Sequence, residues 1–315
     1  MNRETFLNSR EVSEFIEWML DILPSLHVSL SVSKQGTGRG GSGVCCEVNN
    51  FSTLVDLYCW NSKWIDLDGC EVRSSDWNST LLSQVQLQTW IKREIESVLG
   101  MDGILKAAQA VAQWGGDRNS RVGMMKFLQS LTDVRGYFRE VKHLLALKEA
   151  DLTKLNRIIR MNSMLTKVHA LIADDGLPIY DSRVAGAIGA LVEIYRQQRG
   201  LRWCEIPEAL QFKAPYRETR RRVICLSAPN QTVVDPGVFP VSHLERAVQW
   251  SSAKIRLGWL IEALIQKNAD RNSMLLNEEC VKLDRYSQMR AIEASFFMLG
   301  FDLTCFRPMM SKRRD

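Results

Sequence analysis

The spacing of hydrophobic residues changes once along this chain, and that change restricts the fold more than any other feature. Between residues 26 and 33 apolar and polar side chains alternate, which is the period of a strand with one buried face. From Ser79 almost to the C-terminus apolar residues recur three and four positions apart, which is the period of a helix with one buried face. We therefore expect an α+β protein in which a small antiparallel sheet precedes a mostly helical body.

The same pattern predicts the individual elements and two domains. A helix is expected over residues 9–23, where the helical period runs up to Pro24. We expect an N-terminal α/antiparallel-β domain over residues 1–100 and a helical domain over residues 101–315. Strands are predicted over residues 26–33, 44–48 and 51–60, with a fourth near 64–72. Helices are predicted over residues 81–99, 103–113, 124–132, 134–148, 152–160, 165–173, 182–198, 243–267 and 277–299.

Composition excludes several classes of protein. The chain has 315 residues, of which 24% are charged and 45% hydrophobic, as in an ordinary globular protein. Its apolar runs are shorter than the roughly 20 residues of a membrane helix, and charged residues stand where a signal peptide would be apolar. We therefore expect a cytoplasmic protein with no membrane partner. The eight cysteines form no CxxC pair, and no Asp, Glu and His cluster has ligand spacing, so no metal site or metal-dependent nuclease is expected.

Charge is divided unevenly along the chain. Residues 1–100 hold 8 Lys or Arg against 13 Asp or Glu, whereas the remaining 215 residues hold 33 against 23. The net charge of +5 therefore combines an acidic N-terminal part with a basic C-terminal part. A polyanion, nucleic acid first, is one partner that such a surface suits, and a merely solvated basic surface is the alternative.

Residues 151–174 are predicted to form a helical hairpin. Its two short helices are joined by residues 161–164, and Ser163 is the expected N-cap of the second helix. The free N–H groups of that helix N-terminus would then suit a phosphate. Lys167 falls in the first turn of the second helix, and Asp181, which follows Pro178, is the expected N-cap of the helix over residues 182–198.

These residues resemble the helix-hairpin-helix superfamily of base-excision DNA glycosylases, and within it most resemble bacterial proteins similar to 8-oxoguanine DNA glycosylase. Thr166-Lys167-Val168 matches the hairpin motif, Asp181 follows a proline as in the family, and Trp114-Gly115-Gly116 looks like a turn found in the bacterial members. The resemblance covers roughly residues 100 to 265. Where the family has a glycine-rich turn before the lysine, this chain has Asn162-Ser163-Met164-Leu165.

The resemblance implies a DNA glycosylase with Lys167 and Asp181 as its catalytic pair. Cleavage of an N-glycosidic bond develops positive charge on the sugar, which a carboxylate near C1′ would stabilise. Asp181 would also deprotonate either Lys167 or a water, and either of these would attack C1′. Tyr180, Trp203 and Trp250 are the expected residues of a pocket for the flipped base.

The implied partner is double-stranded DNA containing a modified base, with no obligate protein partner. An oxidised purine in repair and a hypermodified base of phage DNA in antiviral defence are both compatible with the residues, and a non-catalytic DNA-binding or protein-interaction module is the alternative. No cofactor and no iron–sulfur cluster are expected, although the hairpin allows a structural monovalent cation. The residues expected to contact DNA are Ser163, Thr166, Arg183, Arg217, Arg220, Arg221 and Arg222.

Overall fold

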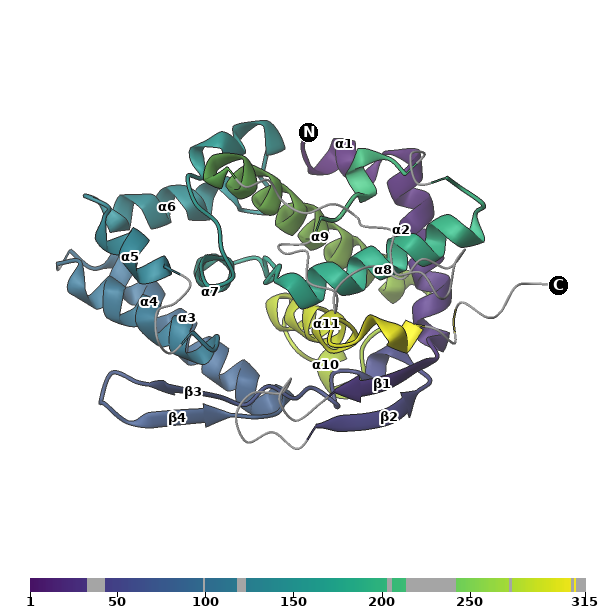
Figure 1. Ribbon diagram of the computed structural model, residues 1–315, viewed down its shortest axis with the longest axis horizontal. Coiled ribbons are helices and arrows are strands. Elements are labelled where there is room, and N and C mark those ends of the chain that lie inside the picture. The colour runs from purple at the N-terminus through teal and green to yellow at the C-terminus, as the bar shows by residue number, and fades with distance from the viewer. Residues whose placement is uncertain are drawn as a thin grey trace.

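The computed structural model describes residues 1–32, 43–98, 100–117, 123–202, 206–213, 242–271, 274–306 and 309. Helices dominate it, and the strands lie along one side of the helical body (Figure 1). This mixed arrangement agrees with the expected α+β class.

The strands are β1 (Val28–Val32), β2 (Val44–Val48), β3 (Ser62–Ile65) and β4 (Glu71–Ser74). The α-helices are α1 (Arg3–Leu7), α2 (Arg10–Ile22), α3 (Trp77–Glu96), α4 (Asp102–Trp114), α5 (Met124–Gln129), α6 (Val134–Leu144), α7 (Leu165–Ile172), α8 (Ser182–Gln198), α9 (His243–Arg271), α10 (Glu278–Val281) and α11 (Arg285–Leu299). Short 3₁₀ helices are η1 (Leu23–Ser25), η2 (Phe51–Thr53), η3 (Leu152–Arg157), η5 (Glu208–Leu210) and η7 (Leu303–Phe306).

The strands pair as two separate two-stranded sheets. β1 and β2 are antiparallel with Val28 opposite Val48, and β3 and β4 are antiparallel with Ser62 opposite Ser74. The single strand expected near residues 64–72 is therefore a hairpin that turns at residues 66–70.

The prediction of a strand over residues 51–60 was wrong. This segment begins as η2 and continues in turns, and Asn50 caps it by accepting a hydrogen bond from the Ser52 amide. Its fully buried apolar residues are Phe51, Leu54 and Val55, whose spacing is that of a helical turn rather than of a strand.

Several helix boundaries differ from the prediction because side chains cap the backbone. α3 begins at Trp77 because Asp76 and Ser79 form a capping box. The helix predicted over residues 277–299 is two helices, and Asp284 caps the second one. The first helix of the predicted hairpin, over residues 152–160, is only the 3₁₀ helix η3. Within the described residues no helix has the length and apolar character needed to cross a membrane.

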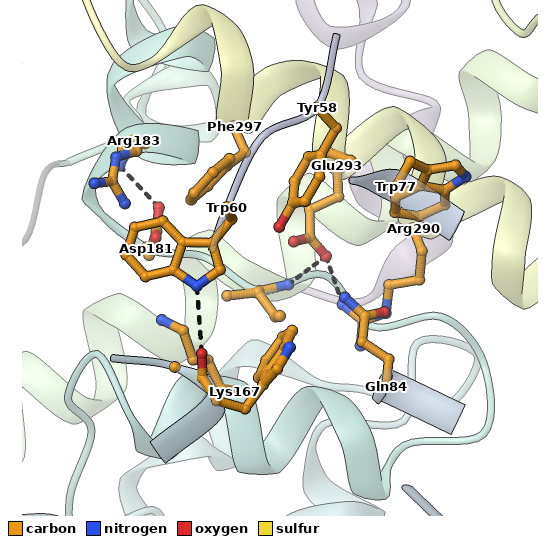
Figure 2. A pocket seen from close by; sticks show the side chains of 14 residues that line it. Tyr58, Trp60, Trp77, Gln84, Lys167, Asp181, Arg183, Arg290, Glu293 and Phe297 are labelled. Carbon is orange, nitrogen blue, oxygen red and sulfur yellow. Dashed lines mark hydrogen bonds and ion pairs between the residues drawn. The ribbon is translucent and has the colours of Figure 1, made fainter. Parts of the chain in front are cut away.

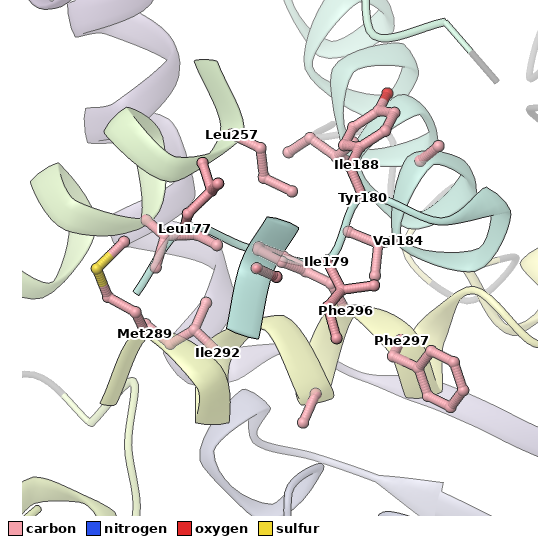
Figure 3. Packing of buried hydrophobic residues seen from close by; sticks show 14 of the residues in the cluster. Leu177, Ile179, Tyr180, Val184, Ile188, Leu257, Met289, Ile292, Phe296 and Phe297 are labelled. Atoms are coloured by element: carbon pink, nitrogen blue, oxygen red, sulfur yellow. The ribbon is translucent and has the colours of Figure 1, made fainter. Parts of the chain in front are cut away.

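The core runs through α8, which is buried from Val184 to Arg196 and packs against α11. Apolar side chains of α8, α9 and α11 meet around the segment that precedes α8, where Leu177 and Ile179 are buried (Figure 3). α1 and α2 also pack against α9. One hydrophobic cluster thus contains residues from both sides of position 100, and the proposed domain boundary there stays a prediction.

Candidate functional site

A pocket brings together parts of the chain that lie far apart in sequence (Figure 2). Its lining includes Lys167 from α7, Asp181 from the start of α8, and Glu293 from α11. Its empty space is about 490 Å³ when the part open to solvent is included, and the space open to water-sized molecules is about 50 Å³. That smaller volume suits only a few water molecules. Its aromatic residues are Tyr58, Trp60, Trp77, Trp114 and Phe297.

Lys167 lies in the first turn of α7, as predicted, and its side chain is largely withdrawn from solvent with 9% exposure. The amine Nζ donates to the Ser163 carbonyl oxygen at 3.0 Å. The prediction that Ser163 caps this helix was wrong. Asn162 Oδ1 instead accepts hydrogen bonds from the amides of Met164 and Leu165 at 2.9 and 2.8 Å. The Asn162 amide side chain therefore organises the turn that presents Lys167.

Asp181 is the N-cap of α8, which confirms the structural part of its prediction. Its Oδ1 accepts from the amides of Arg183 and Val184 at 2.8 and 3.1 Å, and the residue is 6% exposed. The side chain of Asp181 consequently sits at the positive end of the long helix α8. A buried amine and a buried carboxylate therefore line the same small pocket.

Thr166 connects the segments that carry these two residues. Its hydroxyl accepts a hydrogen bond from the Tyr180 amide at 3.2 Å, so the residue before Lys167 is bonded to the residue before Asp181. Lys254 on α9 donates to the Thr166 carbonyl and hydroxyl oxygens at 2.6 and 3.2 Å. Thr166 is fully buried, so in this arrangement it does not contact DNA as predicted.

Lys254 has no solvent exposure. Burial, with the nearby Arg290 charge, holds its pKa well below the usual lysine value. Burial also lowers the pKa of its neighbour His169 well below the ordinary value. Sequence patterns do not single out Lys254, because a lysine within a helical pattern normally lies at the surface.

The Trp114-Gly115-Gly116 turn forms one wall of the pocket. A Cβ atom added to Gly115 would lie 2.7 Å from Lys167 Cδ, so the lysine side chain passes directly over this glycine. Gly116 has a φ of +95° and lies under the ring of Trp60, whose Nε1 donates to the Trp114 carbonyl oxygen at 3.3 Å. The turn therefore positions both the lysine and an aromatic wall.

Glu293 is a second pocket carboxyl group that the sequence analysis missed. Its Oε2 accepts from the Ile179 amide at 2.9 Å and pairs with the Arg290 guanidinium on the same helix. Burial is the largest effect on this carboxyl and raises its pKa, and the nearby Asp181 charge raises it further. The available signal was a charged pair, Arg290 and Glu293, at helical spacing inside an apolar helix.

Two of the residues predicted for the base pocket, Tyr180 and Trp250, do not line the pocket described above. Tyr180 and Trp250 are fully buried in the core, where Trp250 Nε1 donates to the Tyr180 carbonyl oxygen at 2.7 Å. Trp203 lies outside the described residues. The aromatic residues that do line the pocket come largely from the N-terminal hundred residues, which sequence patterns had assigned to strands and their connections.

Arg183 lies at the aromatic side of the pocket. Its guanidinium is 5.0 Å from the Trp60 ring centre, 4.8 Å from that of Phe297 and 4.3 Å from that of Phe301. Cation–π contacts of this kind hold the group in place beside Asp181.

The other expected DNA contacts are only partly described. Ser163 remains partly exposed beside the Lys167 amine, whereas Arg217, Arg220, Arg221 and Arg222 lie outside the described residues. The carbonyl oxygens of residues 162–164 accept hydrogen bonds within the hairpin, and the monovalent cation that the sequence allowed stays a prediction. In the described part of the chain no group of three His, Cys, Asp or Glu residues is arranged to hold a metal ion.

Comparison of the chain with protein-family models, with curated proteins and with solved structures finds no match.

Proposed function

We propose that this protein is a DNA glycosylase of the helix-hairpin-helix type, which removes a modified base by cleaving its N-glycosidic bond. The observation that carries the proposal is the placement of the Lys167 amine and the Asp181 carboxylate on one aromatic pocket. η3 and α7 would form the hairpin, shortened in its first helix.

The two side chains have complementary chemistry. As the base departs, positive charge develops on the sugar ring, and the Asp181 carboxylate stabilises that charge. The Lys167 amine attacks C1′ once it has lost a proton. Attack by Lys167 gives a Schiff base, whereas attack by a water activated by Asp181 leaves an abasic site.

The pocket has to widen before it admits a base. Its cavity of about 50 Å³ holds only a few waters, so aromatic side chains must move as the nucleotide is flipped from the duplex. Trp60 is partly exposed and its indole makes one long hydrogen bond, so we expect this side chain to move when the pocket widens. The remaining aromatic rings then provide surfaces on which the flipped base stacks.

The proposed substrate is double-stranded DNA with an oxidised purine or a hypermodified base. The excess of basic residues after position 100 supports a DNA partner, because phosphate contacts depend on Lys and Arg. A cytoplasmic location would suit either repair or defence against phage.

Duplex oligonucleotides test this proposal directly. We would incubate the protein with duplexes carrying 8-oxoguanine, 5-hydroxymethylcytosine or glucosylated 5-hydroxymethylcytosine, and measure strand breaks after alkali. We expect Lys167→Ala and Asp181→Asn to lower the single-turnover rate by about 10² to 10⁴ fold. Asn keeps the oxygen that caps α8, so Asp181→Asn should fold normally while losing the charge. Lys148→Ala removes an exposed lysine and is the matched control.

Borohydride trapping separates the two mechanisms, because only a lysine adduct becomes covalently fixed to DNA. Full activity in both variants would contradict the site assignment. Binding to modified duplex without any base release would instead indicate a non-catalytic DNA-binding module.

A further inference from the structure

Glu293 also lines the pocket, and the reaction proposed for Lys167 and Asp181 assigns it no role. It projects from α11 and is 6% exposed, and Figure 2 shows its carboxyl group between the side chains of Tyr58 and Arg290. One oxygen, Oε2, is held by the Ile179 amide at 2.9 Å and by the Arg290 guanidinium. The orientation of the carboxyl group is therefore set by two donors on a single oxygen.

The other oxygen, Oε1, has no hydrogen bond to any residue that the structure describes. The residue lines the pocket, so this oxygen is the part of the carboxyl group left for a ligand or a water. Arg290 is engaged on its other side, where Nη2 donates to the Ala170 carbonyl oxygen at 2.9 Å. The pair is thus anchored to α7, the helix that carries Lys167.

Charged and titratable groups from several elements surround this carboxyl group. Burial is the largest effect and raises its pKa, Arg290 and the Ile179 amide lower it, and Asp181 raises it, with a net upward shift. Glu293 thus holds its proton to a higher pH than an exposed glutamate does. The surrounding charged and titratable side chains are Tyr58, Lys167, Asp181, Arg183, Lys254 and Arg290.

We propose that Glu293 is the general acid of this site and delivers a proton from Oε1 to the departing base. The inference rests on the proposed glycosylase function. As the bond from C1′ to the base nitrogen breaks, its electron pair passes to the base, and the Glu293 proton neutralises that charge on a ring nitrogen or exocyclic oxygen. Lys167 forms the new bond to C1′, and the proton that its nitrogen loses passes to Asp181.

The surroundings of Glu293 suit both forms of the carboxyl group. The neutral acid is favoured before the reaction by burial and by the negative charge of Asp181. The carboxylate formed by proton transfer is stabilised by the Arg290 guanidinium and the Ile179 N–H, which already contact Oε2. Three roles are thus divided among Lys167, Asp181 and Glu293, which attack, stabilise charge and protonate respectively.

The test compares pH–rate profiles of the full-length wild type and Glu293→Gln under single-turnover conditions. The probe is whichever of the three modified duplexes the wild type cleaves best. An acid is active only while protonated, so the wild-type rate should fall as pH rises through the Glu293 pKa. We expect Glu293→Gln to be about 10² to 10⁴ fold slower below that pKa and to lack this descending limb.

Glu193→Gln is the matched control. Glu193 is also buried and pairs with an arginine three residues away, Arg196, but it does not line the pocket. Glu293→Gln retains a side-chain oxygen for Arg290 and Ile179, and thermal unfolding of both variants verifies that they fold. The control should keep both the rate and the descending limb.

The experiment distinguishes failure of the general-acid role from failure of the glycosylase function. If the wild type is active and Glu293→Gln keeps its rate and its descending limb, the general-acid role is overturned while the glycosylase proposal stands. If both glutamine variants lose activity equally with an unchanged pH profile, Glu293 is structural and the role is again overturned. A wild type that cleaves none of the three duplexes would overturn the proposed function and the acid with it.

Discussion

At the scale of single residues, the position of Lys167 in the pocket depends on the absence of a side chain at Gly115. Gly115 leaves room for the Lys167 side chain, which a Cβ atom at that position would meet at 2.7 Å. Its φ is in the ordinary helical region, so backbone conformation does not require glycine there. Close approach of the Lys167 side chain, with the Met164 sulfur at 3.0 Å from the same Cβ position, explains this residue.

Replacing Gly115 with alanine should therefore affect the reaction more than the fold. The added methyl group displaces the flexible lysine chain, so we expect a loss of about 1 kcal/mol in unfolding free energy. The cleavage rate should fall at least about tenfold, because the amine moves from its position beside the sugar. Urea denaturation and single-turnover cleavage measure the two effects.

Gly100→Ala is the comparison for this variant, because a Cβ atom at Gly100 meets nothing within 4 Å. We expect it to keep its activity. Equal activity of Gly115→Ala and wild type would show that the placement of Lys167 is not critical.

At the scale of elements, α7 and the segment before α8 form one unit through Thr166. The Thr166 hydroxyl accepts a hydrogen bond from the Tyr180 amide, and the Lys254 amine of α9 donates another to the same hydroxyl. Both contacts are buried, so removing the Thr166 hydroxyl would take a buried hydrogen bond from each donor. This unit determines where Lys167 stands relative to Asp181.

Thr166→Val should weaken that unit without changing the volume of the core. The Tyr180 amide would lose its acceptor, and Lys254 would keep only the carbonyl oxygen. We expect a loss of about 1 to 3 kcal/mol in unfolding free energy, from the two buried hydrogen bonds that the hydroxyl accepts. The cleavage rate should also fall, as measured in the duplex assay.

Thr166→Ser retains the hydroxyl and is expected to keep most of the activity. If the valine variant were as active as the serine variant, the hydroxyl would not be what aligns the two segments.

At the scale of the whole molecule, the two predicted domains share one core and one pocket. α1 and α2 pack on α9, and Glu17 of α2 pairs with Lys267 and Arg271 of α9. The pocket takes Trp60 and Trp77 from before residue 100, and its polar side chains largely from after it. The acidic N-terminal part therefore completes the pocket of the basic part.

A fragment of residues 101–315 should consequently fail to fold cooperatively. Its α9 would expose the apolar surface that α1 and α2 cover, and hydrophobic burial is the main stabilising contribution. We expect a broad thermal transition by circular dichroism and no base release from the duplexes. A sharp transition with full helix content would instead establish two independent domains.

Sequence patterns were most successful where the structure depends on near neighbours. The apolar spacing of residues 9–23 correctly predicted α2, and the capping role of Asp181 followed from its place before an apolar helix. The prediction for residues 51–60 was wrong because an apolar and aromatic composition suits a buried turn as well as a strand. The Ser163 cap was wrong because Asn162, one residue earlier, competes for the same amides.

The sequence by itself determined the helical body, the strands before it, the division of charge, and the local positions of Lys167 and Asp181 on their helices. These properties depend on residues a few positions apart, so hydrophobic period and capping preference suffice to predict them. Only the tertiary structure decided that Tyr58, Lys167 and Glu293 line one pocket, and that Tyr180 and Trp250 do not. Contacts between residues more than a hundred positions apart arise from the packing of whole elements, which local patterns do not encode.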